Sequence, residues 1–363
     1  MNLVWRGPVT DPGGCAAAGR AFLRGLTEEG ARVRLEPNLW NAREAITAAE
    51  KRDLVALTTT ELAVVDASVQ HTIRRLFDPY MPGRVRVGCT RFPTDRIPAD
   101  WVPRCNALDE VWVPTEHARE AFAAAGVEED RLAVIPEPVE LDRIDRSAAP
   151  LAIPGAHGTV FLAVLDWSRR KGWDALLAAW CDAFAASDDV TLVLKASGTS
   201  RGIGTQEIEG ELVAELGRLG RDPGAIADLV IVDDLLPAPD MCRLYAASSA
   251  VVAPARAEAW GRPLVEAMAM GRPVIATAWS GPSAYIDDAV GWPLGFDLAP
   301  VSAAAAAEDP AIAGRRWAEP RHADLVGPLR GVHAGPHEAR ARGAAGIVRA
   351  GRYDHRTVAR AAL

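Results

Sequence analysis

The sequence predicts an α/β protein made of two Rossmann-like, doubly wound domains that face each other across a cleft. Both halves of the 363-residue chain begin with the order strand, loop, helix, strand, and both contain a later strand that runs into a helix. Alternating strands and helices favour parallel sheets, because crossover helices join parallel strands. Between the halves, residues 147–158 contain two prolines, two glycines and no Asp, Glu, Lys or Arg, as is typical of a linker.

The first half supplies the first of these repeated units. Its expected elements are a strand at 3–5, a Gly- and Pro-rich loop at 6–14, a helix around 18–26, a strand at 33–35, a later strand at 110–114 and a helix at 116–125. In the first helix, Ala18, Phe22 and Leu26 recur at helical spacing and predict one buried face. We assign residues 1–150 to an N-terminal domain.

The second half repeats the same order. Its expected elements are a strand at 159–164, a polar loop at 166–172, a helix at 173–186, a strand at 190–194, a strand at 250–254 and a final helix. Pro263 suits the first turn of that last helix and Gly271 its C-terminal end. We assign residues 151–345 to a C-terminal domain, and 346–363 to a C-terminal helix that returns to the first domain.

The composition excludes several classes of protein. A hydrophobic content of 49% and a mean hydropathy of +0.01 are typical of soluble globular chains. The net charge of −8 argues against nucleic acid or anionic lipid as a partner. Five cysteines occur without a Cys-x-x-Cys pair, which favours reduced thiols and a cytoplasmic location.

A run of three cations lies in the polar loop of the second half. Arg169, Arg170 and Lys171 follow a strand directly and precede a helix, so they can neutralise a diphosphate with help from the helix dipole. A solvated basic loop explains these three residues equally well when they are taken alone. Carboxylates later in the same domain favour phosphate binding.

Two glutamates, Glu258 and Glu266, stand eight positions apart around the last strand-to-helix turn. We expect Glu258 on the loop after the strand and Glu266 in the first helical turn, both facing the crevice at the carboxyl edge of the sheet. Two carboxylates can hold a polyhydroxylated ligand while backbone N–H groups at the helix start meet an anion. This combination suits a nucleotide sugar.

The first half offers weaker candidates. Gly13 and Gly14 end the Gly-rich loop that enters the first helix, where such a loop can approach a phosphate or a sugar closely. A flexible connection is an equal alternative. His71 precedes the strand expected at 85–87, and an isolated histidine of this kind is more often structural than catalytic.

The chain lacks the motifs that several other kinds of functional site require. The chain contains no Asp-x-Asp, and Gly335-Pro336 breaks any helix that would align His333 with His337, so we expect no metal and no cofactor. A nicotinamide dehydrogenase needs an intact glycine fingerprint, but Glu207 stands where the third glycine would follow Gly202 and Gly204. The absence of a Gly-x-Ser-x-Gly elbow argues against an α/β-hydrolase.

Taken together, the motifs resemble those of the family 4 retaining glycosyltransferases, which have the GT-B fold. Glu258 and Glu266 match the paired-glutamate motif of that family, and residues 261–264 resemble its Gly-Phe-Gly-Leu-Pro variants. The resemblance covers most of the chain, with further likeness at residues 111–115, 134–139, 274–277 and 280–281. It implies a hexosyltransferase that retains anomeric configuration and needs no metal, with the acceptor bound by residues 1–150 and the nucleotide-sugar donor by residues 151–345.

The resemblance also implies roles. Glu258 would contact hydroxyls of the transferred glucose- or N-acetylglucosamine-type sugar, Glu266 the ribose of the nucleotide, expected to be UDP, and Lys171 the leaving diphosphate. Backbone amides around Trp260, Gly261 and Arg262 would face the donor. Many members carry an arginine six residues before the lysine, where this chain has Leu165. Either Arg169 or Arg170 would then supply the second cation.

A narrower resemblance concerns the acceptor. Residues 91–102 resemble a Phe-Glu-Thr-Asp-Arg-x-Pro-x-x-Trp segment of one branch, with Pro93 in place of its glutamate. His71 lies where that branch often has a histidine near the reacting sugar, which implies a catalytic role. With its Trp5-Arg6-Gly7-Pro8 opening, the chain is similar to transferases that glycosylate 2-deoxystreptamine in aminoglycoside antibiotic biosynthesis.

Other functions are compatible with the same fold. A polysaccharide-building transferase and a GT-B nucleotide-sugar epimerase are enzymes of the same architecture, whereas a non-catalytic sugar-nucleotide binding protein would keep Lys171 and Glu266 without an acceptor pocket. The intact Glu258 favours an enzyme. We expect a small-molecule donor and a small-molecule acceptor as partners, with no nucleic acid and no membrane insertion.

Overall fold

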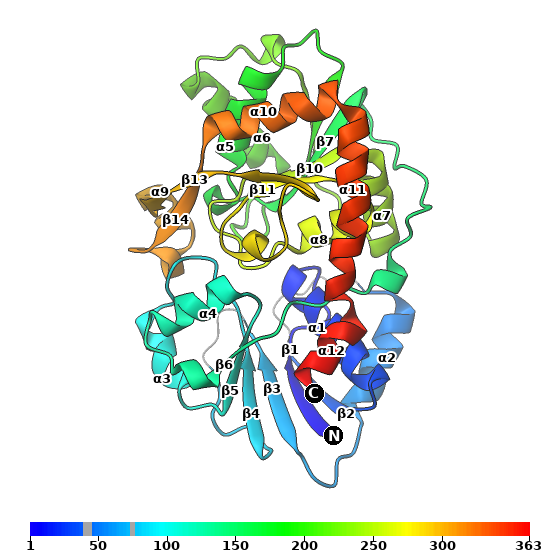
Figure 1. Cartoon of the computed structure of the whole chain (residues 1–363), viewed down its shortest axis with the longest axis vertical. Helices are drawn as coiled ribbons and strands as arrows, with labels where there is room; N and C mark the ends of the chain where they lie inside the picture. The colour runs from blue at the N-terminus through cyan, green and yellow to red at the C-terminus, as the bar shows by residue number, and fades with distance from the viewer. Residues whose placement is uncertain (39–45, 73–76) are drawn as a thin grey trace. The chain divides into compact units, whose positions relative to one another are not determined.

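The chain forms two compact units in a computed structural model (Figure 1). The structure describes residues 1–38, 46–72 and 77–363. Unit 1 comprises Met1–Arg143 and Arg352–Leu363, and unit 2 comprises Ile144–Gly351. The division therefore falls at Arg143, before the linker at 147–158. The last residues of the chain belong to unit 1.

Unit 1 is built on a parallel sheet. Within its described residues, six strands follow the order β2-β1-β3-β4-β5-β6, with bounds β1 Asn2–Gly7, β2 Arg32–Pro37, β3 Ala67–His71, β4 Val85–Cys89, β5 Glu110–Val113 and β6 Leu132–Val134. Trp5 on β1 lies opposite Leu35 on one side and Val69 on the other. Because the chain continues from β2 to the far side of β1, the topological switch point lies between β1 and β3.

The described helices of unit 1 are α1 Gly14–Glu28, α2 Ala48–Thr58, α3 Val102–Cys105, α4 Glu116–Ala123 and α12 His355–Ala362. The predicted apolar face of α1 is buried, and the ring of Phe22 lies 5.3 Å from that of Trp5 on the sheet. Burying a large apolar side chain of this kind contributes about 1.5–3 kcal/mol. This packing fixes the N-terminus of α1 just beyond the end of β1.

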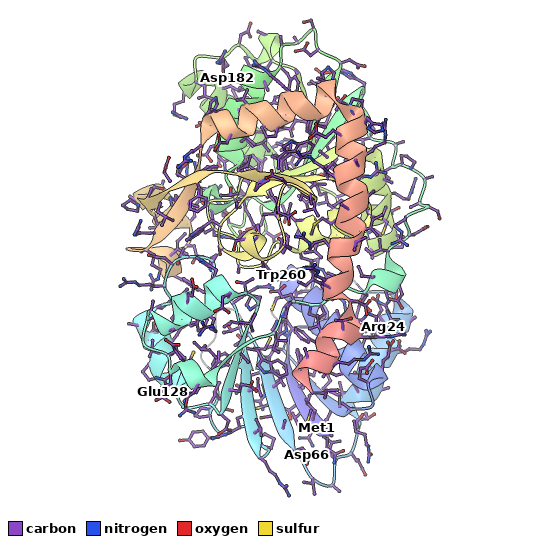
Figure 2. All side chains as sticks on the ribbon, viewed as in Figure 1. Met1, Arg24, Asp66, Glu128, Asp182 and Trp260 are labelled. Carbon is purple, nitrogen blue, oxygen red and sulfur yellow. The ribbon has the colours of Figure 1, made fainter. Side chains whose placement is uncertain are left out.

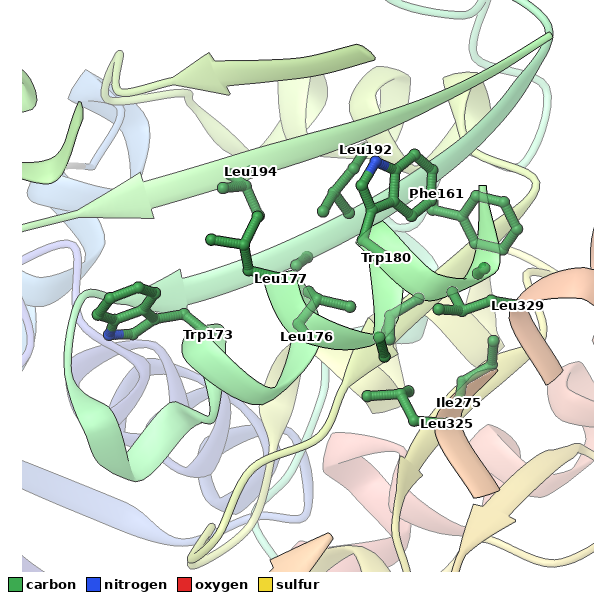
Figure 3. Packing of buried hydrophobic residues seen from close by; sticks show 14 of the residues in the cluster. Phe161, Trp173, Leu176, Leu177, Trp180, Leu192, Leu194, Ile275, Leu325 and Leu329 are labelled. Atoms are coloured by element: carbon green, nitrogen blue, oxygen red, sulfur yellow. The ribbon is translucent and has the colours of Figure 1, made fainter. Parts of the chain in front are cut away.

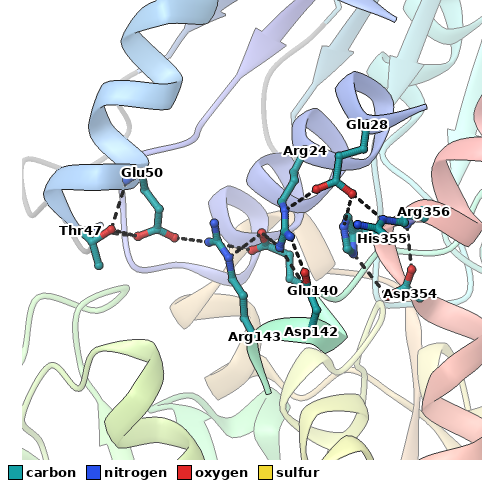
Figure 4. Close-up of polar contacts among 10 residues, drawn as sticks. All are labelled: Arg24, Glu28, Thr47, Glu50, Glu140, Asp142, Arg143, Asp354, His355 and Arg356. Atoms are coloured by element: carbon teal, nitrogen blue, oxygen red, sulfur yellow. Dashed lines mark hydrogen bonds and ion pairs between the residues drawn. The ribbon is translucent and has the colours of Figure 1, made fainter. Parts of the chain in front are cut away.

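Helix α12 packs on α1 through small side chains and charge pairs (Figure 4). A Cβ atom at Gly25 would lie 2.3 Å from the carbonyl oxygen of His355, so α1 needs a glycine there. Glu28 accepts hydrogen bonds from Arg356 at 2.6 Å and from His355 Nε2 at 3.1 Å. The segment expected as one helix at 346–363 is divided, because a 3₁₀ turn at Gly351–Tyr353 separates the end of α11 from α12.

Unit 2 has a parallel sheet of the same kind. Its order is β12-β11-β10-β7-β8-β9, with bounds β7 Thr159–Asp166, β8 Val190–Ser197, β9 Asp228–Val232, β10 Ala250–Ala253, β11 Val274–Thr277 and β12 Gly291–Leu294. After β9 the chain returns to the far side of β7, so the switch point lies between β7 and β10. The two sheets confirm the predicted α/β class with two Rossmann-like domains.

The helices of unit 2 are α5 Trp173–Ala183, α6 Thr205–Arg218, α7 Ala238–Ala247, α8 Arg262–Ala269, α9 Ala303–Glu308, α10 His322–Ala334 and α11 Pro336–Ala350. One core joins α5, α6 and α10 to the sheet (Figure 3), with Trp180 5.5 Å from Phe161 between ring centroids. Helix α5 ends earlier than the expected residue 186, because Phe184 takes an extended backbone conformation and buries its ring against Trp180.

A short antiparallel hairpin, β13 Phe296–Pro300 and β14 Arg316–Pro320, follows the main sheet of unit 2. Helix α9 lies between its two strands in the sequence, and packs near the loop that follows β7. No helix within the described parts of the chain is both long and apolar enough to cross a membrane.

Candidate functional site

A pocket opens at the carboxyl ends of β7 and β10, the two strands that flank the switch point of unit 2. Val164, Leu165, Val252 and Ala253 contribute apolar surface from the strand ends, and the loops above them contribute Lys171, Glu258, Gly261 and Pro263. Open α/β sheets bind ligands at this place, because the loops diverge there and leave a crevice. The pocket therefore brings together Lys171 and Glu258, which lie 87 positions apart in the sequence.

The loop after β7 is ordered by a glycine. Arg169–Lys171 form a 3₁₀ turn, and Gly172 follows with φ at +71°. A Cβ atom at Gly172 would lie 2.0 Å from the carbonyl oxygen of Pro254 at the end of β10. Both the positive φ and the close approach require glycine. The loop is thereby held against β10, and Lys171 is directed at Glu258.

Lys171 and Glu258 form an ion pair, and each side chain is 16% exposed. Burial lowers the pKa of Lys171, and the adjacent Glu258 carboxylate opposes that effect. The pair presents an ammonium group and a carboxylate side by side in one small pocket. Such a pair can bind an anionic group and a hydroxyl group of the same ligand.

The other two cations of the loop diverge. Arg170 donates a hydrogen bond to the carbonyl oxygen of Ala257 at 2.5 Å, and its guanidinium lies 3.9 Å from Glu258. Arg169 instead pairs with Asp174 at 3.5 Å and lies over the ring of Trp173. Of the two arginines expected to compensate for Leu165, Arg170 is therefore the one beside Glu258.

Glu266 lies in the second turn of α8, not in the first as expected, because the helix begins at Arg262. Both of its oxygens are engaged: Arg262 Nε donates to Oε1 at 2.8 Å, and Tyr245 Oη donates to Oε2 at 2.9 Å. Its side chain is 19% exposed. Burial and the Glu266 carboxylate raise the pKa of Tyr245, so its hydroxyl stays protonated and donates.

The turn between Glu258 and α8 is set by a second glycine. Gly261 has φ at +87°, and a Cβ atom there would lie 2.5 Å from Tyr285 Oη. That hydroxyl donates to the carbonyl oxygen of Trp260 at 2.5 Å. Trp260, which Figure 2 labels, is buried. Tyr285 therefore binds the carbonyl groups of the turn. The turn leads into α8, whose first N–H groups have no partner within the helix.

Arg256 organises this site, although its sequence context gave no reason to single it out. Its guanidinium binds Asp174 at 2.6 and 3.1 Å, Glu319 on β14 at 2.8 Å, and the carbonyl oxygen of Arg169 at 2.7 Å. The side chain is 9% exposed and lies over the ring of Trp317. One residue thus ties the hairpin to the loop that carries Lys171.

A second pocket lies in unit 1, at the carboxyl ends of β3, β4, β5 and β6. Its walls include Phe22, Trp112 and Ile135, and its polar side chains include an ion pair between Arg91 and Glu137. Sequence reasoning did not select either charged residue. Both stand within segments, 91–102 and 134–139, that were noted only for their resemblance to other chains.

His71 is the last residue of β3 and is 2% exposed. Its Nε2 atom lies 3.4 Å from Cys15 Sγ, and a Cβ atom at Gly19 would lie 3.3 Å from its Nδ1 atom, so both ring nitrogens are turned toward α1. Burial, with a contribution from Arg91, lowers the pKa of His71 to about 3. The imidazole is therefore neutral at pH 7 and enclosed by protein.

Gly13 and Gly14 lie at the N-terminus of α1, as the N-cap residue and the first helical residue. The N–H group of Gly13 donates to the carboxylate of Asp11 at 2.9 Å. Gly14 is exposed and has open space where a Cβ atom would stand. Like His71, these glycines belong to unit 1, whereas the other candidate residues belong to unit 2.

The buried state of His71 predicts a pH-dependent stability. Its pKa falls from an ordinary 6.5 to about 3 on folding, so between these values the unfolded chain binds more protons than the folded chain. The contribution to stability is complete above pH 6.5 and is lost as the pH falls toward 3. We expect His71 to account for about 3 kcal/mol of the acid destabilisation between pH 7 and pH 4.

Urea unfolding of the full chain at pH 7, 5 and 4 measures this effect. The His71→Asn variant should lose less stability on acidification than the wild type. His157→Asn is the control, because Asp189 and Asp228 raise the pKa of that exposed histidine and give its contribution the opposite sign. Equal acid sensitivity of the wild type and His71→Asn would contradict the prediction.

Part of the chain is similar to a described protein family. Residues 156–309 match the family described as glycosyl transferases group 1. A D-inositol 3-phosphate glycosyltransferase of Segniliparus rotundus is 27% identical over 248 residues, which are 67% of this chain and 47% of that protein. One of Corynebacterium kroppenstedtii is 35% identical over 147 residues, 40% of this chain and 30% of that protein. The chain thus spans less than half the length of these relatives.

Solved structures resemble the chain over its whole length. HepE of Anabaena, solved in complex with UDP-glucose, has a TM-score of 0.65 at 16% identity, covering 99% of this chain and 98% of its own. Sucrose-phosphate synthase of Thermosynechococcus elongatus has a TM-score of 0.64 at 16% identity, with 100% and 97% covered. The chain therefore has the GT-B fold, and its residues 156–309 are similar to the group 1 glycosyl transferases.

Proposed function

We propose that this protein is a retaining, metal-independent glycosyltransferase. It moves a hexose of the glucose or N-acetylglucosamine type from a UDP-sugar to a hydroxyl group of a small acceptor. The observation that carries the proposal is the Lys171–Glu258 pair in the pocket at the switch point between β7 and β10. The match of residues 156–309 to glycosyl transferases group 1 supports it.

In the proposed reaction, the cations and the carboxylates of the site have different roles. Lys171, with Arg170 beside it, stabilises the negative charge that develops on the leaving diphosphate, which is the largest demand of this reaction. Glu258 accepts hydrogen bonds from hydroxyls of the transferred sugar, and Glu266 from the ribose. The acceptor hydroxyl attacks the anomeric carbon on the face that the diphosphate leaves, and a diphosphate oxygen takes the hydroxyl proton. The new glycosidic bond keeps the original configuration.

The acceptor is proposed to be a cyclitol, and specifically an aminocyclitol of the 2-deoxystreptamine type used in antibiotic biosynthesis. The names of the curated relatives, D-inositol 3-phosphate glycosyltransferases, support a cyclitol ring. The complex of HepE with UDP-glucose supports a UDP-hexose donor. The unit 1 pocket, with aromatic walls and a buried carboxylate, supports a small polar ring as ligand.

The test combines donor binding with product analysis. We expect a UDP-hexose to raise the melting temperature in a panel of nucleotide sugars, and mass spectrometry to detect a glycosylated cyclitol product. Glu266→Ala should weaken UDP-sugar binding about 10-fold or more, because a hydrogen bond to a charged group is lost. Glu209→Ala, on the exposed face of α6, is the matched control and should leave binding unchanged.

Other results of this test would favour one of the alternative functions. A donor that binds but transfers its sugar to no hydroxylated small molecule would favour a sugar-nucleotide binding protein. Conversion of the donor into its epimer, without any acceptor product, would favour an epimerase. Extension of an oligosaccharide with no cyclitol product would favour a polysaccharide-building transferase.

A further inference from the structure

The unit 1 pocket contains a charged group with an unused hydrogen-bonding atom. Glu137 follows β6, and its side chain is only 7% exposed. One carboxylate oxygen pairs with Arg91, whereas Oε2 has no hydrogen-bond partner among the described residues. A buried carboxylate oxygen without a donor costs free energy, and a ligand group that donates to Oε2 would recover it.

The surroundings of Glu137 limit what that ligand can be. Phe22, Trp112 and Ile135 form apolar walls that suit the C–H face of a saturated ring. His71, which also lines the pocket, is neutral at pH 7, because burial lowers its pKa to about 3. Among the described lining residues, the charges are therefore Arg91 and Glu137, which already neutralise each other.

Because Arg91 and Glu137 neutralise each other, the pocket should favour ligand groups that donate a hydrogen bond over anionic groups. A hydroxyl or ammonium group can donate to Glu137 Oε2 without disturbing the pair with Arg91. A phosphate group has no proton to donate to Glu137 when it is fully ionised, and its negative charge would lie close to the Glu137 carboxylate. Like charges in a buried pocket repel strongly, because the local dielectric is low.

We propose that Glu137 is the residue that recognises the acceptor, and that it selects an unphosphorylated cyclitol through a hydroxyl or ammonium group donated to its Oε2 atom. The inference rests on the proposed transferase function and refines its acceptor class. It differs from what the names of the curated relatives state, since those proteins act on an inositol phosphate.

The test measures kcat/KM at a saturating donor concentration for 2-deoxystreptamine, myo-inositol and myo-inositol 3-phosphate. The wild type should prefer one or both unphosphorylated compounds over the phosphate by at least about 10-fold, and the first two compounds separate an ammonium from a hydroxyl donor. Glu137→Gln should lower kcat/KM for the preferred acceptor about 10- to 100-fold, mainly through KM. Glu129→Gln is the control, because that side chain is 74% exposed.

A second variant protects the test against misfolding, since Glu137→Gln leaves Arg91 buried without its carboxylate. The double variant Arg91→Met with Glu137→Gln replaces the pair by neutral groups, which folded proteins commonly tolerate. Donor affinity, measured by calorimetry, should stay within twofold of the wild type in both variants. Acceptor kcat/KM should fall in both.

Two results would overturn the inference. One is a wild-type preference for myo-inositol 3-phosphate over both other compounds. The other is turnover of the preferred acceptor within twofold of the wild type in both Glu137 variants. Normal donor binding in either case leaves the transferase function standing. Failure of the wild type to bind any nucleotide sugar would instead remove the function on which the inference rests.

Discussion

Replacing Lys171 with methionine should lower kcat/KM for sugar transfer by roughly 10²- to 10³-fold, the loss expected when one group that stabilises developing negative charge is removed. Methionine keeps the length of the side chain but removes its charge. Lys171 contacts Glu258 at the strand ends of the switch point, so its ammonium group lies where a leaving diphosphate is proposed to form. The effect should fall mainly on kcat, because charge develops on the diphosphate only as the bond breaks.

Two further variants make the Lys171 result specific. Lys171→Arg keeps the charge but cannot reproduce the compact ammonium group, so its rate should lie between those of the wild type and Lys171→Met. Lys51→Met removes a lysine from the exposed side of α2 and should leave the rate unchanged. Steady-state kinetics with the donor identified by thermal shift measures all three. A Lys171→Met enzyme within threefold of the wild type would contradict the assigned role.

The fold could be predicted from the sequence because its information is local. The apolar strand at residues 3–5, the helical spacing of Ala18, Phe22 and Leu26, and the repetition of the same order after residue 159 define each element within a short window. The structure confirms these elements, with β1 at Asn2–Gly7, α1 at Gly14–Glu28 and β7 at Thr159–Asp166. The parallel order of the strands then follows from the crossover connections.

The site was only partly predictable, because its pairs come from distant parts of the chain. Lys171 and Glu258 could be expected together, since each follows a strand and all parallel strands end at one edge. Glu266 was expected one turn too early, because the sequence does not fix whether Arg262 or a later residue such as Pro263 begins the helix. Its contact with Tyr245 on α7 depends on helix packing, which no local pattern encodes.

Charge runs and isolated polar residues were the least predictable parts. The consecutive Arg169, Arg170 and Lys171 give no indication of their directions, yet the 3₁₀ turn sends Arg169 to Asp174 and Arg170 toward Glu258. Arg256 looks like an ordinary loop arginine in the sequence, whereas in the structure it is buried among three segments. Burial is a property of the tertiary fold, and it decides what each of these charges contributes.

The burial of Arg256 leads to a second large effect. Arg256→Met should lower the free energy of unfolding by about 3–5 kcal/mol, because it removes the main cation from the Asp174 carboxylate, whose side chain is only 14% exposed. The guanidinium contacts Asp174, Glu319 and the carbonyl oxygen of Arg169, and hydrogen bonds to the two carboxylates raise the pKa of Arg256 despite its burial. Urea unfolding measures the loss. Arg321→Met is the control, since the side chains of its ion pair with Asp297 are 54% and 73% exposed, so its loss should leave the free energy of unfolding nearly unchanged.

The same contacts predict a catalytic consequence that stability alone does not explain. Arg256→Lys keeps the charge, but an ammonium group cannot bind Asp174 through two nitrogens while also reaching Glu319 and the Arg169 carbonyl. The loop that carries Lys171 should then lose its fixed position, and kcat should fall about 10-fold or more at a temperature where the variant is fully folded. Normal kcat in a folded Arg256→Lys enzyme would contradict this role. It would show that the contacts of Arg256 with the hairpin stabilise the unit but do not position Lys171.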